Sequence, residues 1–242
     1  ASAFLPSYGL AEATLAVTIM PPGEGIRVEL VEEERLSGTP RDLSRPARYR
    51  AIVNCGKAVK DMAIEIRGER GGPLSDHHIG KVWCRGPSVM HSYFRDPEAT
   101  ADCLVDGWLD TGDMGYLVDG YLFIVGRAKD MIIINGKNHW PQDIEWAVEQ
   151  LPGFNHGDIA AFSIEMDNGE EAPAVLVHCR VSDEDKRIEL RNMIRDKVRS
   201  ITGTSRPSSS SSRRRSRSVA RSFDASMVSR CFTNGETAMA RS

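Results

Sequence analysis

The sequence of 242 residues lacks a long apolar run. No stretch reaches the roughly 18 consecutive apolar residues that a membrane-spanning helix needs, so we expect no membrane span. The opening residues 1–7 carry no basic cluster, and we therefore expect no signal peptide. The chain starts with Ala1 instead of methionine, and from this we expect it to be a piece of a longer protein.

Closely spaced cysteine pairs are also lacking. The chain has five scattered cysteines, namely Cys55, Cys84, Cys103, Cys179 and Cys231. An odd and widely spaced set argues against both a disulfide framework and a zinc site. These observations predict a protein of the reducing cytoplasm.

Lysine is absent from the last part of the chain, where the charge also changes sign. Residues 205–242 contain eight arginines and two acidic residues, a net charge of +6, whereas the whole chain carries −3. Serine and arginine dominate this tail, and few apolar residues and no periodicity remain, as is typical of disorder. We expect the tail to be either naturally disordered or the product of a shifted reading frame.

The remainder of the chain predicts a mixed α+β fold. Hydrophobic residues make up 40% and charged residues 27% of the chain, as in folded globular proteins. Residues 1–126 read as short strands joined by Gly, Pro and Asp turns. Asp119-Gly120 lies between two apolar runs and predicts a β-hairpin.

Residues 130–204 predict a smaller α+β unit. Pro is favoured at the first position of a helix, and Gly often ends one. The expected elements are a helix that Pro141 opens, strands over 159–164 and 174–179, and an amphipathic helix over 183–201 that Gly203 ends. The boundary between the two parts is expected at residues 127–129.

Four short segments carry a more specific signal through their order and spacing. They are Tyr8-Gly9-Leu10-Ala11-Glu12, Gly86–Tyr93, Trp108–Asp113 and Gly126–Glu145. Over residues 1–204 this series resembles the adenylate-forming superfamily of acyl-CoA synthetases, peptide-synthetase adenylation domains and luciferases. It is most similar to the fatty acyl-AMP ligases, although Ala11 stands where most relatives carry Thr. The long segment Val28–Cys55 also resembles the insertion that marks these ligases.

The resemblance implies a fold and a reaction. Residues 1–126 would be the C-terminal part of the large AMP-binding domain, with a β-rich subdomain. Residues 127–129 would be a hinge, and residues 130–204 the small mobile C-terminal domain. The enzyme would activate a fatty acid with ATP to acyl-AMP and pyrophosphate. It would then pass the acyl group to the thiol of an acyl carrier protein or a polyketide synthase carrier domain.

The resemblance also implies roles for individual side chains. Glu12 would bind Mg²⁺, a cation that prefers carboxylate oxygen, and would be catalytic together with Arg127. Tyr8 and Gly9 would contact the nucleotide, with Tyr8 stacked on adenine. Asp113 would accept hydrogen bonds from both ribose hydroxyls. Arg127 would bind ribose or phosphate as a permanent cation.

Two further residues would serve the movement of the small domain. Lys129 matches the hinge position of the family, where a few residues absorb the backbone change. Gly136 matches a loop that approaches the pantetheine arm, where a missing Cβ permits close contact. The alternative interpretation of Lys129 is a solvated loop lysine. The alternative interpretation of Gly136 is the second residue of an Asn135-Gly136 turn. His139 and Trp140 are expected to pack beside the domain interface.

Three other functions compete with a fatty acyl-AMP ligase. An acyl-CoA synthetase would use the same residues with free CoA as the acceptor, and an inactive truncation product fits the same family. Nucleic-acid binding through the Arg/Ser tail is the rival from another class. The tail offers only Phe223 and Phe232 for stacking, and the rest of the chain is acidic, so no nucleic acid is expected.

Two segments of the family pattern do not occur in the sequence. One is the phosphate loop expected before Tyr8, and the other is a Pro-x-Thr-x-x-Gly-Lys motif expected after Ile201. The last lysine is Lys197, inside the predicted helix. Because the late lysine of the family stabilises charge that develops during adenylation, we expect the chain alone to bind ATP poorly and to be inactive. The purified chain should give no fatty-acid-dependent exchange of pyrophosphate into ATP, and measurable exchange would contradict this expectation.

Overall fold

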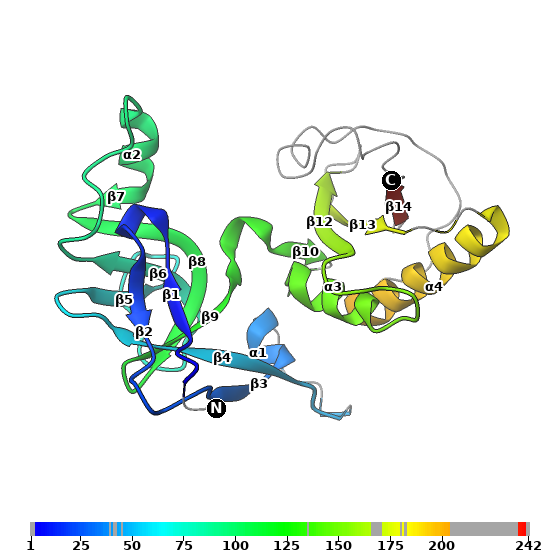
Figure 1. Ribbon diagram of the computed structural model, residues 1–242, viewed down its shortest axis with the longest axis horizontal. Helices are drawn as coiled ribbons and strands as arrows, with labels where there is room; N and C mark the ends of the chain where they lie inside the picture. Colours follow the sequence, from blue (N-terminus) through cyan, green and yellow to red (C-terminus); the bar gives the residue numbers. More distant parts are fainter. Residues whose placement is uncertain are drawn as a thin grey trace. The chain divides into compact units, whose positions relative to one another are not determined.

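The structure of the chain is a computed structural model (Figure 1). It divides into two units, Ala1–Lys129 and Asp130–Ser242. The structure describes residues 3–38, 40, 43–44, 46–134, 136–165, 171–179, 181, 183–203 and 237–240. In these ranges no helix is both long enough and apolar enough to cross a membrane.

The first unit is built on a nine-stranded sheet in the order β1-β2-β4-β9-β8-β6-β5, with β3 added to β4 and β7 to β8. Its strands are β1 (Ser7–Gly9), β2 (Ala16–Ile19), β3 (Val28–Glu32), β4 (Tyr49–Ala58), β5 (Ala63–Arg67), β6 (Gly80–Arg85), β7 (Leu104–Val105), β8 (Trp108–Val118) and β9 (Tyr121–Arg127). The helical pieces are η1 (Ala11–Ala13), α1 (Glu33–Ser37), α2 (Pro97–Cys103) and η2 (Ala128–Asp130). The strands of the sheet pair antiparallel, and consecutive strands can therefore be joined by tight turns.

The predicted hairpin joins β8 to β9 and is confirmed. Val118 lies opposite Tyr121, and the turn residues Asp119 and Gly120 both have positive φ, 51° and 77°. Positive φ at both central residues is typical of a type I′ turn, whose twist matches that of the flanking strands. The turn therefore fixes the register of β8 and β9 from Val118↔Tyr121 to Gly115↔Ile124.

The segment Val28–Cys55 forms β3, α1 and most of β4, and β3 pairs with β4 along its whole length. Arg35 of α1 fastens this segment to the sheet. Its guanidinium lies 5.0 Å from the ring centroid of Tyr116 on β8 and 3.7 Å from the carboxylate of Glu29 on β3. Tyr116 is fully buried and stacks on Phe123 of β9.

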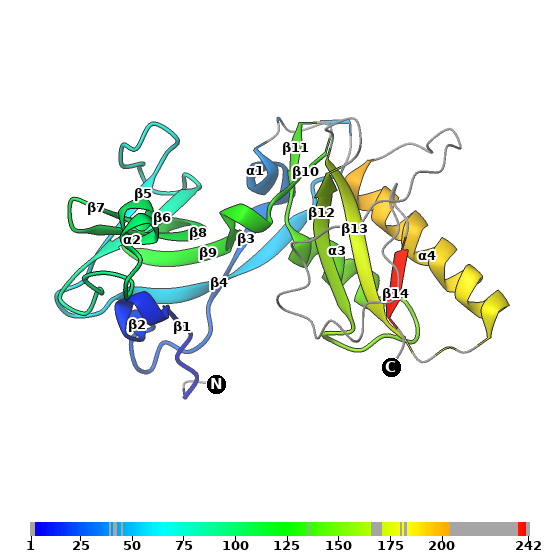
Figure 2. The same ribbon diagram turned by 90° about the horizontal axis from the view of Figure 1, so that it is seen from above.

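The second unit combines two helices with two small sheets. Its elements are β10 (Ile132–Ile134), β11 (Lys137–His139), α3 (Pro141–Glu149), β12 (Ile159–Glu165), β13 (Glu171–His178), α4 (Glu184–Thr202) and β14 (Thr237–Ala240). β10 and β11 pair with each other, and β12, β13 and β14 form the other sheet (Figure 2). Together with the first unit, this confirms the predicted mixed α+β class.

Both predicted helices of this unit are confirmed, with the expected residues at the start of α3 and on either side of α4. α3 starts at Pro141. Before α4, the side chain of Asp183 accepts a hydrogen bond from the backbone N–H of Lys186 at 3.0 Å, which satisfies one of the donors left over at a helix start. Gly203 follows α4 with φ of 69°, in the left-handed region that glycine adopts without strain.

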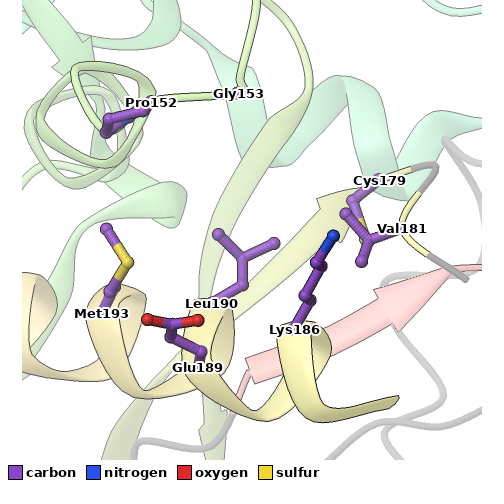
Figure 3. Close-up of a pocket in the computed structure, with 8 residues that line it drawn as sticks. All are labelled: Pro152, Gly153, Cys179, Val181, Lys186, Glu189, Leu190 and Met193. Carbon is purple, nitrogen blue, oxygen red and sulfur yellow. The ribbon is translucent and has the colours of Figure 1, made fainter. Parts of the chain in front are cut away.

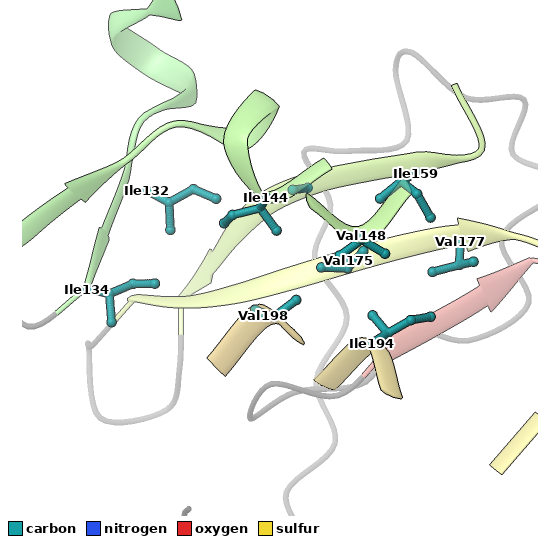
Figure 4. Packing of buried hydrophobic residues seen from close by; sticks show 10 residues of the cluster. Ile132, Ile134, Ile144, Val148, Ile159, Val175, Val177, Ile194 and Val198 are labelled. Atoms are coloured by element: carbon teal, nitrogen blue, oxygen red, sulfur yellow. The ribbon is translucent and has the colours of Figure 1, made fainter. Parts of the chain in front are cut away.

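The two helices cover the same face of the β12–β13 sheet. Residues that alternate along β12 and β13 point to one face, and there they meet the apolar sides of α3 and α4 (Figure 4). The buried cluster comprises Ile132, Ile134, Ile144, Val148, Ile159, Ala161, Val175, Val177, Ile194 and Val198. The second unit thus has a hydrophobic core built from its own residues.

The tail differs from expectation at one place. Residues Thr237–Ala240 form β14, which pairs parallel with β13 through the register Val175↔Thr237 to His178↔Ala240. The prediction that the tail lacks regular structure is therefore wrong for these four residues, because an open strand edge can pair with any extended backbone. The rest of the tail, and Asn135 of the predicted turn, lie outside the described residues.

Replacing Ile194 tests whether this core holds the second unit together. Ile194 is fully buried, and Ile194→Ala should lower the free energy of unfolding by about 2–5 kcal/mol through lost burial and the cavity left behind. Ile188→Ala is the matched control on the same helix, because Ile188 is 45% exposed and should cost far less. Urea unfolding followed by circular dichroism measures both. Equal losses for the two variants would contradict the described core.

Candidate functional site

Three of the predicted site residues meet at the carboxylate of Asp113. Beyond a shift of the β8–β9 register by one residue between Met114 and Gly115, Asp113 of β8 lies opposite Arg127 of β9. Asp113 Oδ1 accepts a hydrogen bond from Arg127 Nε at 3.0 Å, and Oδ2 accepts one from the hydroxyl of Tyr8 at 2.6 Å. Tyr8 lies 105 residues away in the sequence and reaches this point from β1.

The side chains of this cluster differ in their exposure to solvent. Asp113 is 9% exposed, whereas the side chain of Arg127 is 62% exposed. Burial, and then the hydrogen bond to Asp113, raise the pKa of Tyr8 far above its usual value. Tyr8 therefore stays neutral and donates its hydroxyl proton to the hydrogen bond with Asp113. The guanidinium of Arg127 is the exposed member of this cluster.

The part of β8 that carries Asp113 is held by hydrogen bonds of neighbouring side chains. The hydroxyl of Thr111 donates to the carbonyl of Val82 at 2.8 Å and accepts from the backbone N–H of Asp113 at 3.2 Å. Asp110 accepts from the backbone N–H of Gly112 at 3.0 Å, and its other oxygen lies 2.9 Å from the ammonium of Lys81. The strand is thereby held over the three residues that precede the acceptor carboxylate.

Gly9 has a structural reason to be glycine. An added Cβ would lie 1.7 Å from the carbonyl oxygen of Leu15, because β1 and β2 approach closely at an irregular register. A contact of Gly9 with a nucleotide stays a prediction.

Glu12 lies on the single turn η1 and is held by a loop that follows β6. The Tyr93 hydroxyl donates to Glu12 Oε1 at 2.7 Å. The backbone N–H of Met90 donates to the carbonyl of Glu12 at 2.7 Å, and the hydroxyl of Thr14 donates to the carbonyl of Ser88 at 3.0 Å. The hydrogen bond to Glu12, followed by burial, raises the pKa of Tyr93 to about 12.

Tyr93 was missed by the sequence analysis, although it ends the second of the four segments. Nothing in its local pattern indicates a partner 81 residues away. One signal in the sequence could have indicated Tyr93. It is an aromatic residue at the end of a motif, three residues before Asp96, which caps α2.

The residues near Glu12 fit a divalent cation that is held mostly by other groups. Within the described ranges no cluster of three or more His, Cys, Asp or Glu side chains could hold a metal ion. A single carboxylate is nevertheless the usual protein contribution to Mg²⁺ that is bound chiefly by phosphate and water. A role of Glu12 in binding Mg²⁺ stays a prediction.

The structure places the two remaining predicted residues without testing their roles. Lys129 lies in η2 and is the last residue of the first unit. Gly136 precedes β11 with φ of 72°, and an added Cβ there would meet no described atom within 4 Å. Positive φ alone therefore explains this glycine.

His139 and Trp140 follow Gly136. Trp140 is 2% exposed. Burial, and then the charge of Lys137, lower the pKa of His139 below its usual value. Their expected position beside a domain interface stays a prediction.

A pocket of about 410 Å³ lies elsewhere in the second unit (Figure 3). It is formed by the loop after α3, the end of β13 and the first turns of α4. Its lining residues are Pro152, Gly153, Cys179, Val181, Lys186, Glu189, Leu190 and Met193. The side chain of Lys186 reaches toward Cys179 and Val181 at one end. None of the candidate site residues predicted from the sequence lines this pocket.

Solved structures establish the class of the fold. A structure from a study of fatty acyl-adenylate ligases from E. coli and L. pneumophila superposes with a TM-score of 0.73 and 40% identity, over 84% of this chain and 36% of the other. No family model matches the chain. The fold is that of a part of an adenylate-forming enzyme.

Sequence relatives agree with this class. A putative acyl-CoA synthetase of Caulobacter vibrioides is 44% identical over 206 residues, which are 83% of this chain and 36% of the relative. The medium-chain-fatty-acid–[acyl-carrier-protein] ligase JamA of Moorena producens is 37% identical over 70% of this chain and 31% of the relative. The chain therefore belongs to the adenylate-forming superfamily of acyl-CoA synthetases and fatty acyl-AMP ligases, and it spans about a third of the length of these relatives.

Proposed function

We propose that the chain is the C-terminal portion of a fatty acyl-AMP ligase, with residues 1–126 in the large AMP-binding domain and 130–204 as the small mobile domain. The observation that carries the proposal is the convergence of Tyr8 and Arg127 on the buried carboxylate of Asp113. The names of two similar proteins, fatty acyl-adenylate ligase and fatty-acid–[acyl-carrier-protein] ligase, support the same assignment.

The proposed reaction has two steps. An oxygen of the fatty carboxylate attacks the α-phosphorus of ATP, and the bond to pyrophosphate breaks, which yields acyl-AMP. The thiol of an acyl carrier protein or polyketide synthase carrier domain then attacks the acyl carbon, loses its proton and releases AMP. Mg²⁺ bound with ATP would supply charge neutralisation in the first step.

Asp113 is the proposed ribose acceptor. Each oxygen of a carboxylate can accept two hydrogen bonds, so the ribose hydroxyls can share Asp113 with Tyr8 and Arg127. The exposure of Arg127, 62%, allows its guanidinium to contact ribose or phosphate as well. Tyr8 is proposed to stack on adenine, with Gly9 beside it, and Glu12 to contribute a carboxylate oxygen to the Mg²⁺ that accompanies ATP.

Lys129 is the proposed hinge. The division of the chain falls between Lys129 and Asp130, which supports rotation of the second unit about this point. A hinge needs only a few residues whose backbone dihedrals change. In the pose that forms the thioester, Gly136 is proposed to lie beside the pantetheine arm of the carrier protein.

An acyl-CoA synthetase is the second candidate, because the relative with 44% identity carries that name. The long segment Val28–Cys55 favours the acyl-AMP ligase. An acceptor assay separates the two, with transfer to a carrier-protein thiol expected and transfer to free CoA expected to be slow. A cytoplasmic location and the absence of nucleic-acid binding remain predictions of the sequence.

Removing the carboxylate of Asp113 tests the nucleotide site. In the complete ligase that contains this chain, Asp113→Ala should lower ATP affinity at least tenfold, because a hydrogen bond to a charged group contributes about 1.5–3 kcal/mol. Isothermal titration with ATP measures the change. Asp119→Asn, in the exposed turn after the same strand, is the matched control, because asparagine also adopts the positive φ of this turn, and it should leave the affinity within about twofold. An unchanged dissociation constant for Asp113→Ala would show that Asp113 has only a structural role in β8.

Restricting the backbone at Lys129 tests the hinge. In the same ligase, Lys129→Pro fixes φ and should slow transfer of the acyl group to the carrier thiol, while acyl-AMP formation survives. Lys129→Ala keeps a free backbone and should leave both half-reactions intact. Single-turnover assays of the two half-reactions measure the effects. Equal loss of both half-reactions in Lys129→Pro would contradict a hinge role.

A further inference from the structure

The turn that carries Glu12 is fastened to one loop by three hydrogen bonds. The side chain of Glu12 accepts from Tyr93, its backbone carbonyl accepts from Met90, and Thr14 at the end of the turn donates to Ser88. Two of these contacts fix the backbone of η1. Only the contact with Tyr93 fixes the direction of the carboxylate itself.

Tyr93 is in turn held by the start of α2. Its backbone N–H donates to the hydroxyl of Thr100 at 3.0 Å, and that hydroxyl donates to the carbonyl of Asp96 at 2.6 Å. The carboxylate of Asp96 caps α2 by accepting from the backbone N–H of Ala99 at 2.9 Å. The backbone of Tyr93 is therefore held at the start of α2, from where its hydroxyl reaches Glu12.

A fixed partner matters for a glutamate because its side chain is flexible. Ordering a free glutamate side chain costs rotamer entropy. The hydrogen bond at 2.7 Å uses Oε1, and no described residue donates to Oε2. An oriented carboxylate with one oxygen committed and one available suits a cation that takes a single protein ligand.

We propose that Tyr93 is a positioning residue that holds Glu12 Oε1, so that Oε2 is presented to the divalent cation of the bound nucleotide. This inference rests on the proposed function, because it takes Glu12 as the protein ligand. It adds a residue from the second sequence segment for which neither the resemblance nor the names of the relatives supply a role.

Tyr93→Phe tests the inference, because it removes one hydroxyl and keeps the ring. The probe is Mn²⁺, titrated by electron paramagnetic resonance into the complete ligase with a non-hydrolysable ATP analogue. Tyr93→Phe should weaken Mn²⁺ binding about three- to tenfold, the equivalent of ordering one side chain. Affinity for the analogue without metal should stay the same. In activity assays the Mg²⁺ concentration for half-maximal rate should rise by a similar factor, and saturating Mg²⁺ should restore the maximal rate.

Tyr49→Phe is the matched control. Tyr49 is exposed and donates to Glu32 Oε1 at 3.3 Å, so it is a second tyrosine–glutamate pair away from Glu12. This variant should bind Mn²⁺ as the unchanged enzyme does. An equal loss in Tyr49→Phe and Tyr93→Phe, or a maximal rate that saturating Mg²⁺ does not restore, would overturn the inference in favour of a purely structural role.

Glu12→Gln separates the two levels of the argument. If it weakens Mn²⁺ binding more than tenfold while Tyr93→Phe has no effect, the positioning role is wrong and Glu12 remains the ligand. If Glu12→Gln also leaves Mn²⁺ binding unchanged, the cation assignment in the proposed function is wrong, and the inference falls with it. A large loss in Glu12→Gln together with the intermediate loss in Tyr93→Phe supports both.

Discussion

The register of the β8–β9 hairpin is the constraint on which the rest of the first unit depends. The side-chain period of a strand is two, so a slip of one residue would turn every side chain of β8 to the opposite face. The type I′ turn at Asp119-Gly120 prevents this slip. It thereby pairs Tyr116 with Phe123, on which Tyr116 stacks, and a shift of the register by one residue between Met114 and Gly115 then sets Asp113 opposite Arg127.

The candidate site is assembled around this hairpin from segments far apart in the chain. Tyr8 reaches Asp113 from β1, across 105 residues, and Tyr93 reaches Glu12 across 81. Both contacts join a neutral tyrosine hydroxyl to a carboxylate, and both orient that carboxylate without neutralising it. A site that binds a nucleotide with its cation needs this combination, since the negative charge must remain and its direction must be fixed.

The second unit has a different physical role. Its ten-residue buried cluster comes from β10, β12, β13, α3 and α4, all after the division at Lys129. A body with its own core can rotate without losing its internal contacts, whereas a unit that shared its core with its neighbour could not. This supports the proposed hinge, because a hinge is useful only between parts that are each stable.

The sequence by itself determined the features that depend on local chemistry. The Asp119-Gly120 hairpin, the start of α3 at Pro141 and the limits of α4 are confirmed, because turn and cap residues act on backbone only a few positions away. The order of the four segments also identified the family. Only the tertiary structure decided that Tyr8 donates to Asp113, that Tyr93 holds Glu12 and that β14 pairs with β13. These pairs depend on the order of strands in the sheets, which local periodicity and spacing do not encode.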